Sequence, residues 1–186
     1  MKTIDLNVKT REAGSKIAED LRRHGFVPAN FYAYGVENIN VYAKALDLRT
    51  IVYTSHKPLV NLHIDDNSEP KKCIVKEIVF DPVTEQITHI DFLGLVENHT
   101  LITELPIVLK GTPEGIRLGG KLQQVLHKIK IKTTPEFLSD SIEIDISQLE
   151  IGKSVYVRDI QREGWKISLP PDTMICSLKF VRQAAS

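Results

Sequence analysis

Basic side chains gather near the start of the chain, and such a cluster could hold the phosphates of a nucleic acid. The cluster lies within fifteen residues and consists of Lys9, Arg11, Lys16, Arg22 and Arg23. Ammonium and guanidinium groups neutralise phosphate charge, and guanidinium groups also contact base edges or stack on bases. A solvated helix face is an equally good interpretation, because Glu19 and Asp20 fall in the same segment. The cluster therefore suggests nucleic acid without requiring it.

A histidine and an aspartate form a second candidate group. His89 and Asp91 are two residues apart in an alternating segment, so both side chains should point from the same face of a strand. A His–Asp pair on the surface can exchange hydrogen bonds with base edges in an irregular RNA groove. The same pair could be half of a catalytic relay, half of a metal site, or exposed without a function. The sequence supplies no nucleophile motif and no third ligand, so an enzyme is the least favoured of these.

A glycine-rich segment approaches the pattern of a nucleotide-binding loop but lacks a residue that the chemistry needs. Residues 115–122 contain three glycines followed by Lys121, as a phosphate-binding loop can. The next position should carry a hydroxyl that coordinates magnesium, and here it is Leu122. A turn between strands is the better interpretation, and we exclude nucleotide hydrolysis.

After His127, lysine and isoleucine alternate over residues 128–132. The alternation predicts a strand with Ile129 and Ile131 in the core and a row of lysines outside. That row could contact RNA or an acidic protein surface. It could equally protect an edge strand against unwanted pairing. Both interpretations stay open.

Composition limits the class of protein. A chain of 186 residues can form one large domain or two domains of about 90 residues. Its 24 basic and 24 acidic residues cancel, so any surface for RNA must be local. Cys73 and Cys176 are too far apart in the sequence for a zinc cluster and give no disulfide framework, which favours a reducing cytoplasm. No apolar run approaches the roughly 20 residues of a membrane span, and no signal peptide opens the chain.

The elements that must position these residues are mostly strands, joined by turns rich in glycine and proline. We expect strands at 3–9, 31–34, 39–42, 59–64, 73–80, 86–92, 101–109, 127–132, 141–146, 154–158 and 174–181. A polar hairpin loop should cover 65–70, and a second helix 47–53. The register breaks near Gly94, which places the domain boundary between residues 95 and 96. Many short strands favour barrels or sandwiches over alternating strands and helices.

A first, short helix should run from Ser15 to Arg23. Ser15 is the expected N-cap, and Ile17 and Leu21 lie four residues apart on the expected inner face. Gly25 should close this helix, and Pro28 prevents its continuation.

In order and spacing, these segments resemble the two-domain form of bacterial large-subunit ribosomal protein twenty-five, also called the CTC or general stress protein family. The match in the first half runs through Arg11, Gly14, Leu21-Arg22-Arg23, Val27-Pro28-Ala29, Tyr32, Asp81-Pro82 and His89-Ile90-Asp91-Phe92. The match in the second half runs through Gly111, Gly115, Gly119-Gly120-Lys121-Leu122, the lysine–isoleucine strand and residues 145–152.

The resemblance implies a mainly β protein: an N-terminal six-stranded β-barrel with short helices over residues 1–95, and a C-terminal β-rich domain over 96–186. It implies that the barrel binds the loop E region of 5S ribosomal RNA in the large subunit. The RNA contacts that it implies are Arg11, Gly14, Lys16, Arg22, Arg23, Tyr32, His89 and Asp91, with Lys9 a weaker candidate. It also implies a non-enzymatic cytoplasmic protein with no cofactor, metal, membrane or small-molecule substrate. Its partners would be 5S ribosomal RNA and neighbouring large-subunit proteins.

Three departures from the family pattern bear on the affinity for RNA. Glu19 and Asp20 stand where the family usually has basic residues, and Val79 stands where a glutamine is typical. Tyr34 follows Tyr32 closely and competes with it for the aromatic role. The alternative is therefore a diverged, stress-related protein-interaction module with weak or no RNA binding.

Overall fold

The computed structural model describes residues 2–54, 56–65, 69–97, 99–117 and 119–180. The chain separates into two compact units, residues 1–99 and 100–186, and each is described by itself. Both units consist largely of strands, which confirms the predicted mainly β class. The boundary between residues 95 and 96 and the roles given to the two domains stay predictions. No helix in the described ranges is long and apolar enough to cross a membrane.

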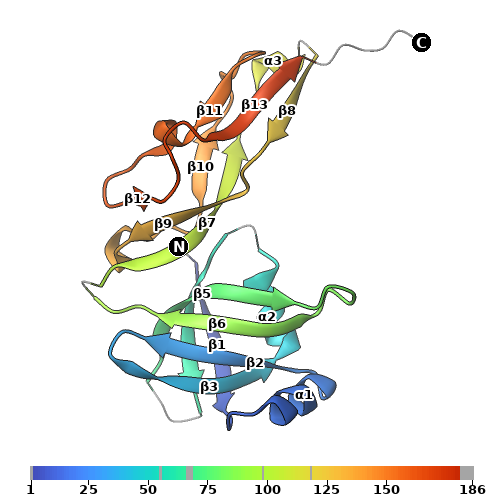
Figure 1. Ribbon diagram of the computed structural model, residues 1–186, viewed down its shortest axis with the longest axis vertical. Helices are drawn as coiled ribbons and strands as arrows, with labels where there is room; N and C mark the ends of the chain where they lie inside the picture. Colours follow the sequence, from blue (N-terminus) through green and yellow to red (C-terminus); the bar gives the residue numbers. More distant parts are fainter. Residues whose placement is uncertain (1, 55, 66–68, 98, 118, 181–186) are drawn as a thin grey trace. The chain divides into compact units, whose positions relative to one another are not determined.

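The N-terminal unit is a closed six-stranded β-barrel (Figure 1). Around the barrel the strands follow the order β1 (Thr3–Thr10), β3 (Val36–Lys44), β2 (Phe26–Ala33), β6 (Ile87–Gly94), β5 (Lys71–Phe80) and β4 (Leu59–Ile64). The pairs β1–β4 and β2–β6 are parallel, and the other four pairs are antiparallel. Alternation along the strands puts every second side chain inside the closed sheet. The resulting core contains Val41, Leu62, Ile90 and Phe92, each 0% exposed.

Helix α2 (Ala45–Val52) completes the barrel core. Leu48 and Ile51 are its buried residues, and both belong to the core cluster of the barrel. Burial of a leucine or isoleucine side chain stabilises the fold by about 1.5–3 kcal/mol, so this helix contributes as much as a strand segment. The hairpin loop predicted for 65–70 joins β4 to β5, and its residues 66–68 lie outside the described residues.

Helix α1 (Ser15–Arg23) covers part of β2 and differs from the prediction at its start. Gly14 occupies the N-cap position, because its carbonyl accepts the first helical hydrogen bond, from the Ala18 N–H at 3.1 Å. Ser15 is therefore the first helical residue, and its prediction as N-cap is wrong. Ile17 is 38% exposed and no residue of α1 is fully buried, so the expected inner face is only a half-buried stripe. Gly25 ends the helix region with a positive φ of 79°, as predicted.

Strand β2 begins five residues before the predicted start at Phe31. Pro28 was expected only to prevent the helix from continuing, and it pairs with Tyr42 of β3 inside the strand. A proline cannot donate to a neighbouring strand, so it is tolerated only where its missing N–H is not needed. The pairing of β2 with β6 begins at Ala29, one residue later. Pro28 therefore lies beside β3 but outside the pairing with β6.

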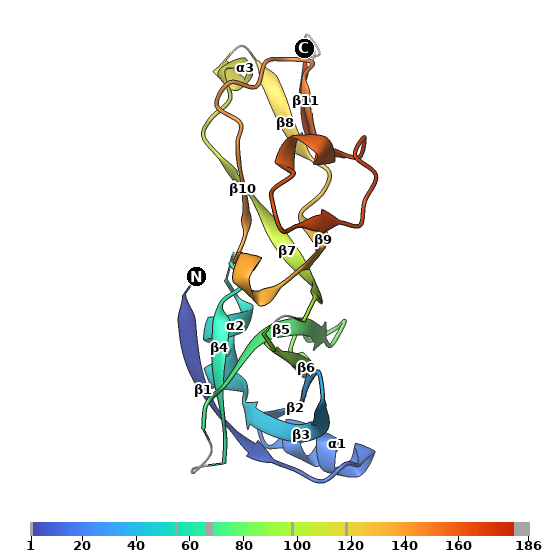
Figure 2. The same cartoon turned by 90° about the vertical axis from the view of Figure 1, so that its left-hand side faces the viewer.

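The C-terminal unit contains two sheets (Figures 1 and 2). The first has the order β10 (Ile142–Asp145), β7 (Leu101–Lys110), β9 (Lys128–Thr133) and β12 (Lys166–Ile167), and the second has β11 (Ser154–Tyr156), β13 (Met174–Phe180) and β8 (Gly120–Gln124). The described connections between these strands include three short helices: α3 (Glu114–Arg117), η1 (Pro135–Phe137) and η2 (Val157–Ile160). Leu105, Ile131 and Ile175 are fully buried at the centre of this unit's own core.

The predictions for the lysine–isoleucine segment and for the glycine-rich segment, both in this unit, compare differently with the structure. Ile129 and Ile131 of β9 are buried and the lysines between them are exposed, as predicted. The edge-strand interpretation is wrong, because β9 pairs with β7 along its length and with β12 at Lys132. The turn interpretation of 115–122 is correct at Gly119, which lies in a turn with a φ of 88°. It is wrong on both sides, because α3 extends to Arg117 and Gly120 opens strand β8, which pairs with β13.

Candidate nucleic-acid interface

The outer face of three neighbouring barrel strands, β2, β6 and β5, carries the candidate interface. The parallel register of β2 and β6 places Asn30 opposite Asp91. On the other side of β6, the antiparallel register places Glu77 opposite Asp91 and Val79 opposite His89. Because Ile90 and Phe92 point into the barrel, the side chains of His89 and Asp91 project outward.

The His89–Asp91 pair lies on one face, as predicted. Nδ1 of His89 is 3.2 Å from Oδ1 of Asp91, and the two side chains are 26% and 27% exposed. The pair lacks the alignment of a hydrogen bond, so the enclosed Oδ1 has no hydrogen-bond donor in the described part of the protein. Buried carboxylate oxygens normally have one. The pair is therefore a polar group whose hydrogen bonding is incomplete in the protein alone.

Arg11 joins this face from the loop after β1. Its Nε donates to the Val41 carbonyl at 3.1 Å, and one terminal nitrogen donates to Oδ1 of Asn30 at 3.3 Å. Burial, and then the charge of Arg22, lower the pKa of Arg11, although an arginine remains protonated in proteins. Two hydrogen bonds thus hold the guanidinium beside Asn30, next to the Asp91 position.

Arg22 links helix α1 to strand β6. Its Nε donates to the carbonyl of Thr88 at 2.9 Å, which holds the arginine beside the residue that precedes His89. Arg22 thus brings the helix and the strand, which are far apart in sequence, to one surface.

The charges around His89 show which residues surround it. Burial lowers its pKa below 6.5, Asp91 raises it, Arg11 and Arg22 lower it, and Glu77 raises it. The net shift is downward, so the imidazole is mostly neutral near pH 7. A neutral imidazole donates from one nitrogen and accepts at the other, which suits exchange of hydrogen bonds with a base or a ribose hydroxyl.

The start of α1 presents Gly14 and Lys16 to solvent. Both residues are exposed, and the first turn of the helix carries no acidic side chain. The free N–H groups at a helix N-terminus attract anions, and a lysine there adds to the attraction. This turn is suited to a phosphate group.

Arg23 does not join the central group. Its guanidinium donates to Glu19 at 2.7 Å, and the His24 ring lies 3.6 Å from Asp20, each pair spanning one turn of α1. The two acidic residues that could weaken the basic helix thus lie against Arg23 and His24 instead of Arg22.

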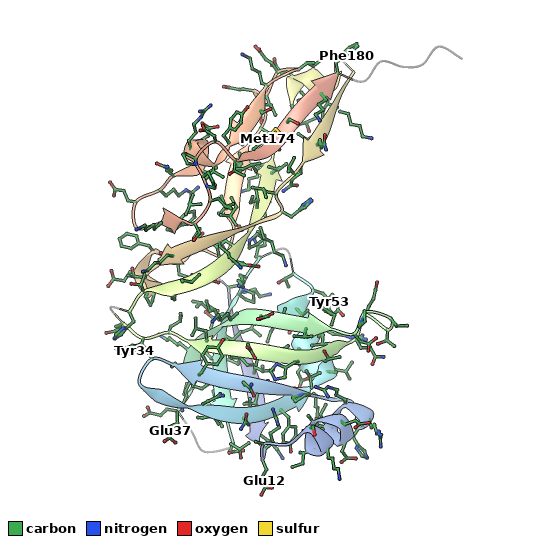
Figure 3. The ribbon with its side chains drawn as sticks, in the orientation of Figure 1. Glu12, Tyr34, Glu37, Tyr53, Met174 and Phe180 are labelled. Carbon is green, nitrogen blue, oxygen red and sulfur yellow. The ribbon has the colours of Figure 1, made fainter. Side chains whose placement is uncertain are left out.

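Tyr32 projects to the same outer face as Asn30, since the two are two residues apart on β2. The ammonium of Lys76 lies 5.3 Å from the centre of the Tyr32 ring, a cation–π contact. Tyr34, its competitor, lies in the turn after β2 at the end of the barrel opposite α1 (Figure 3). Its ring stacks on His99 at 3.8 Å, so Tyr32 is the tyrosine of the candidate face.

The Asp81–Pro82 pair of the sequence match has a structural role. Oδ1 of Asp81 accepts hydrogen bonds from the N–H groups of Thr84 at 2.8 Å and Val83 at 2.9 Å. The bonds from Thr84 and Val83 lower the pKa of the carboxyl group, which keeps it ionised. The carboxylate therefore shapes the turn that sends β6, with His89, back along β5.

Sequence reasoning missed three members of this face: Asn30, Lys76 and Glu77. Asn30 carried a weak signal, because it is a polar residue between the buried Ala29 and Phe31. Lys76 carried none, because it sits at a shift in the β5–β6 register between Val75 and Glu77. Lys9, the weaker candidate, lies on β1 and lines a separate pocket of about 370 Å³.

The assembled face offers charged and hydrogen-bonding groups but no catalytic machinery. The four cationic side chains are Arg11, Lys16, Arg22 and Lys76, and the acceptors are Asp91 and Glu77. Within the described ranges, no group of three or more His, Cys, Asp or Glu side chains could hold a metal ion. The arrangement can neutralise phosphates and exchange hydrogen bonds with an irregular polar groove.

Two family models and several relatives match this chain. The model of the Ribosomal L25p family matches residues 6–92, and that of the C-terminal domain of ribosomal protein TL5 matches residues 100–182. Three relatives bear the name large ribosomal subunit protein bL25. The one from Porphyromonas gingivalis is 34% identical over 185 residues, covering 99% of this chain and 96% of its own. Those from Pelodictyon phaeoclathratiforme and Chloroherpeton thalassium are 34% and 35% identical, covering 96% and 86% of this chain and 90% and 80% of their own.

Proposed function

Because the chain belongs to the Ribosomal L25p family in its two-domain form, we propose that its N-terminal unit binds 5S ribosomal RNA within the large ribosomal subunit. The family membership makes it a structural ribosomal protein and not an enzyme, located on the ribosome in the bacterial cytoplasm. Neighbouring large-subunit proteins are its further partners.

The observation that carries the proposal is the convergence of groups from two distant parts of the sequence. Arg11 and Arg22 come from the first part, His89 and Asp91 from the second, and hydrogen bonds or strand register connect all four. A fold does not require two arginines and an incompletely bonded His–Asp pair on one face. A ligand with phosphates and irregular polar edges accounts for them.

Each group has a distinct task in this proposal. Arg11, Arg22 and the start of α1 hold phosphates and set the orientation of the RNA. His89 and Asp91 exchange hydrogen bonds with base edges or ribose hydroxyls, as recognition of a non-Watson–Crick region requires. Lys76, whose ammonium lies over the Tyr32 ring, adds a positive charge to this face. It is on the same strand as Val79, which replaces the glutamine typical of the family.

The alternative, a protein-interaction module without RNA binding, rested on neutral charge and on Glu19 and Asp20. Their contacts with Arg23 and His24 leave Arg22 directed at β6. The geometry therefore favours RNA binding. The positive surface is smaller than it would be with basic residues in place of Glu19 and Asp20.

The test is the affinity of the full chain for 5S ribosomal RNA at two salt concentrations. We expect Arg11→Ala combined with His89→Ala to weaken binding about 100-fold and to flatten the salt dependence by nearly one unit of slope per lost phosphate contact. Arg49→Ala is the matched control, because Arg49 is an exposed arginine on α2 outside this face. Equal affinities for the double variant and the control would reject the proposed face.

A further inference from the structure

The C-terminal unit contains an unpaired strand edge that lies in a groove. Strand β10 is the last strand of its sheet, and among the described residues it pairs only with β7. A groove of about 390 Å³ is lined by all four residues of β10, from Ile142 to Asp145. Successive side chains of a strand point to opposite faces, so a groove that touches all four must run along the edge.

The register shows which backbone groups face this groove. The N–H of Ile146 donates to the carbonyl of Lys110 on β7 at 2.9 Å. In a strand the hydrogen-bonding direction alternates, so Ile144 also bonds toward β7 while Glu143 and Asp145 point the other way. The N–H and C=O groups of Glu143 and Asp145 therefore face the open side. They meet no backbone partner there in the described part of the unit.

The opposite wall of the groove is formed by β11, by η2 and by the two residues that follow η2. It consists of Val155, Asp159, Ile160, Gln161 and Arg162. Strand β11 is itself the last strand of the second sheet and pairs only with β13. The groove thus lies between the edges of the two sheets, with apolar and polar residues on both walls.

The charged groups of the groove favour a basic occupant. Three carboxylates line it (Glu143, Asp145 and Asp159), against the single guanidinium of Arg162. Lys110 pairs with Glu143 at 2.7 Å, which balances one of these charges. Arg158 lies 4.0 Å from Asp159 but only 3.0 Å from Asp172, so it leaves most of the charge of Asp159 unbalanced. The carboxylate of Asp145 accepts from the hydroxyl and N–H of Ser147, and those bonds lower its pKa and keep it ionised.

We propose that the groove takes an extended, lysine- or arginine-containing segment of another protein, which adds to the sheet as a strand beside β10. Its backbone pairs with the free groups of Glu143 and Asp145, which gives affinity without reading sequence. Its basic side chains approach the carboxylates of the groove, while Ile142, Ile144 and Ile160 stay buried in the core of the unit. This concerns the C-terminal unit alone and does not depend on RNA binding by the N-terminal unit.

Proline at position 143 separates backbone pairing from side-chain contacts. Proline is tolerated at a strand edge where its missing N–H faces outward, so Glu143→Pro leaves the bonds between β10 and β7 intact. Glu143→Ala is the matched control, because it removes the same carboxylate but keeps the N–H. A second pair is Gln161→Trp, which fills the groove from the other wall, with Gln161→Ala as its control.

The probe is a short labelled peptide in which lysine and valine alternate, added to the full-length protein. We expect binding to shift the amide NMR signals of Glu143 and Asp145, and we expect both Glu143→Pro and Gln161→Trp to weaken it roughly tenfold more than their alanine controls. A peptide with glutamate in place of lysine, and a lysine peptide with alternate backbone nitrogens methylated, should bind at least about tenfold more weakly.

Several results would overturn the proposal. Equal binding of the methylated peptide would show that no strand is added. Equal binding of the glutamate peptide would remove the basic partner. Concentration-dependent dimerisation lost in Glu143→Pro would make a second copy of the chain the occupant, and shifts of the same amides by an RNA oligomer would make it RNA.

Discussion

Asn30 and Asp91 stand opposite each other in the parallel pair of β2 and β6. Asn30 accepts a hydrogen bond from Arg11, and Asp91 lies 3.2 Å from His89. The register of one strand pair therefore sets the spacing between the arginine and the His–Asp pair. A shift by one residue would turn Asn30 or Asp91 into the barrel.

The first prediction concerns the pKa of His89, which burial and two arginines hold below 6.5. Asp91→Asn removes the attraction that raises it, so its pKa should fall further. Arg22→Ala removes a repulsion, so its pKa should rise. NMR titration of the His89 imidazole signal measures the pKa in each variant. The signal is assigned as the one that disappears in His89→Asn. A downward shift in Arg22→Ala would contradict the proximity of the two residues.

The same shift has a consequence for stability. Because the folded pKa of His89 lies below its unfolded value of 6.5, the unfolded state binds more protons between the two values. Stability should therefore fall as the pH drops below about 6.5 and level off below the folded pKa. Denaturant unfolding at a series of pH values should show a smaller fall in His89→Asn than in the parent protein.

The second prediction tests Lys76, which the Tyr32 ring holds on the candidate face. Lys76→Gln should weaken 5S RNA binding and reduce the salt slope by a little less than one unit, as expected for one lost phosphate contact. Lys72→Gln is the control, because Lys72 is an exposed lysine of the same strand. A slope unchanged in Lys76→Gln would remove this lysine from the interface.

The third prediction concerns the two cysteines. Burial raises the pKa of Cys73 to about 12 and also raises the pKa of Cys176. The thiolate is the reactive form, so neither side chain should react with a thiol reagent near pH 8 while the protein is folded. Both should react once denaturant is added, which serves as the internal control. Rapid modification of the native protein would mean that a core opens on the time scale of the assay.

The fourth prediction concerns Gly115, the first glycine of the segment that approached a nucleotide-binding pattern. A Cβ at this position would collide with the side chains of Leu178 and Ile151. Gly115→Ala should therefore destabilise the C-terminal unit by about 1–3 kcal/mol. The neighbouring exposed change Glu114→Ala should stay within about 0.5 kcal/mol of the parent protein. Denaturant unfolding compares the two.

The sequence predicted those strands in which the alternation of apolar and polar residues matches the alternation of buried and exposed positions. β9 was predictable because Ile129 and Ile131 alternate with lysines and are the residues that the core buries. β8 was not, because Gly119 and Gly120 signal a turn, and only its pairing with β13 makes the following residues a strand. The early start of β2 could not be predicted either. A proline is accepted inside a strand only where its missing N–H is not needed, and the sequence does not show that β6 begins to pair one residue after Pro28.

The candidate interface shows the same limit more clearly. The residues with recognisable chemistry, Arg11, Arg22, His89 and Asp91, stood out in the sequence, and the structure brings them together. Asn30 could not be assigned a role, because its importance comes from a parallel register between distant segments. Arg23 was expected among the contacts, but it pairs with Glu19 one turn earlier on the exposed side of α1.

The position of β6 has a consequence for a chain that is still being synthesised. β6 is the last barrel strand to leave the exit tunnel, yet it fits between β2 and β5. A nascent chain that ends before Ile87 already carries Arg11 and Arg22 but leaves β2 and β5 with unpaired edges, which invite wrong partners. Arrival of β6 closes those edges and delivers His89 and Asp91 in the same event. If the barrel binds RNA as proposed, an unfinished barrel lacks the His–Asp pair of the site, and the complete site marks a completed fold.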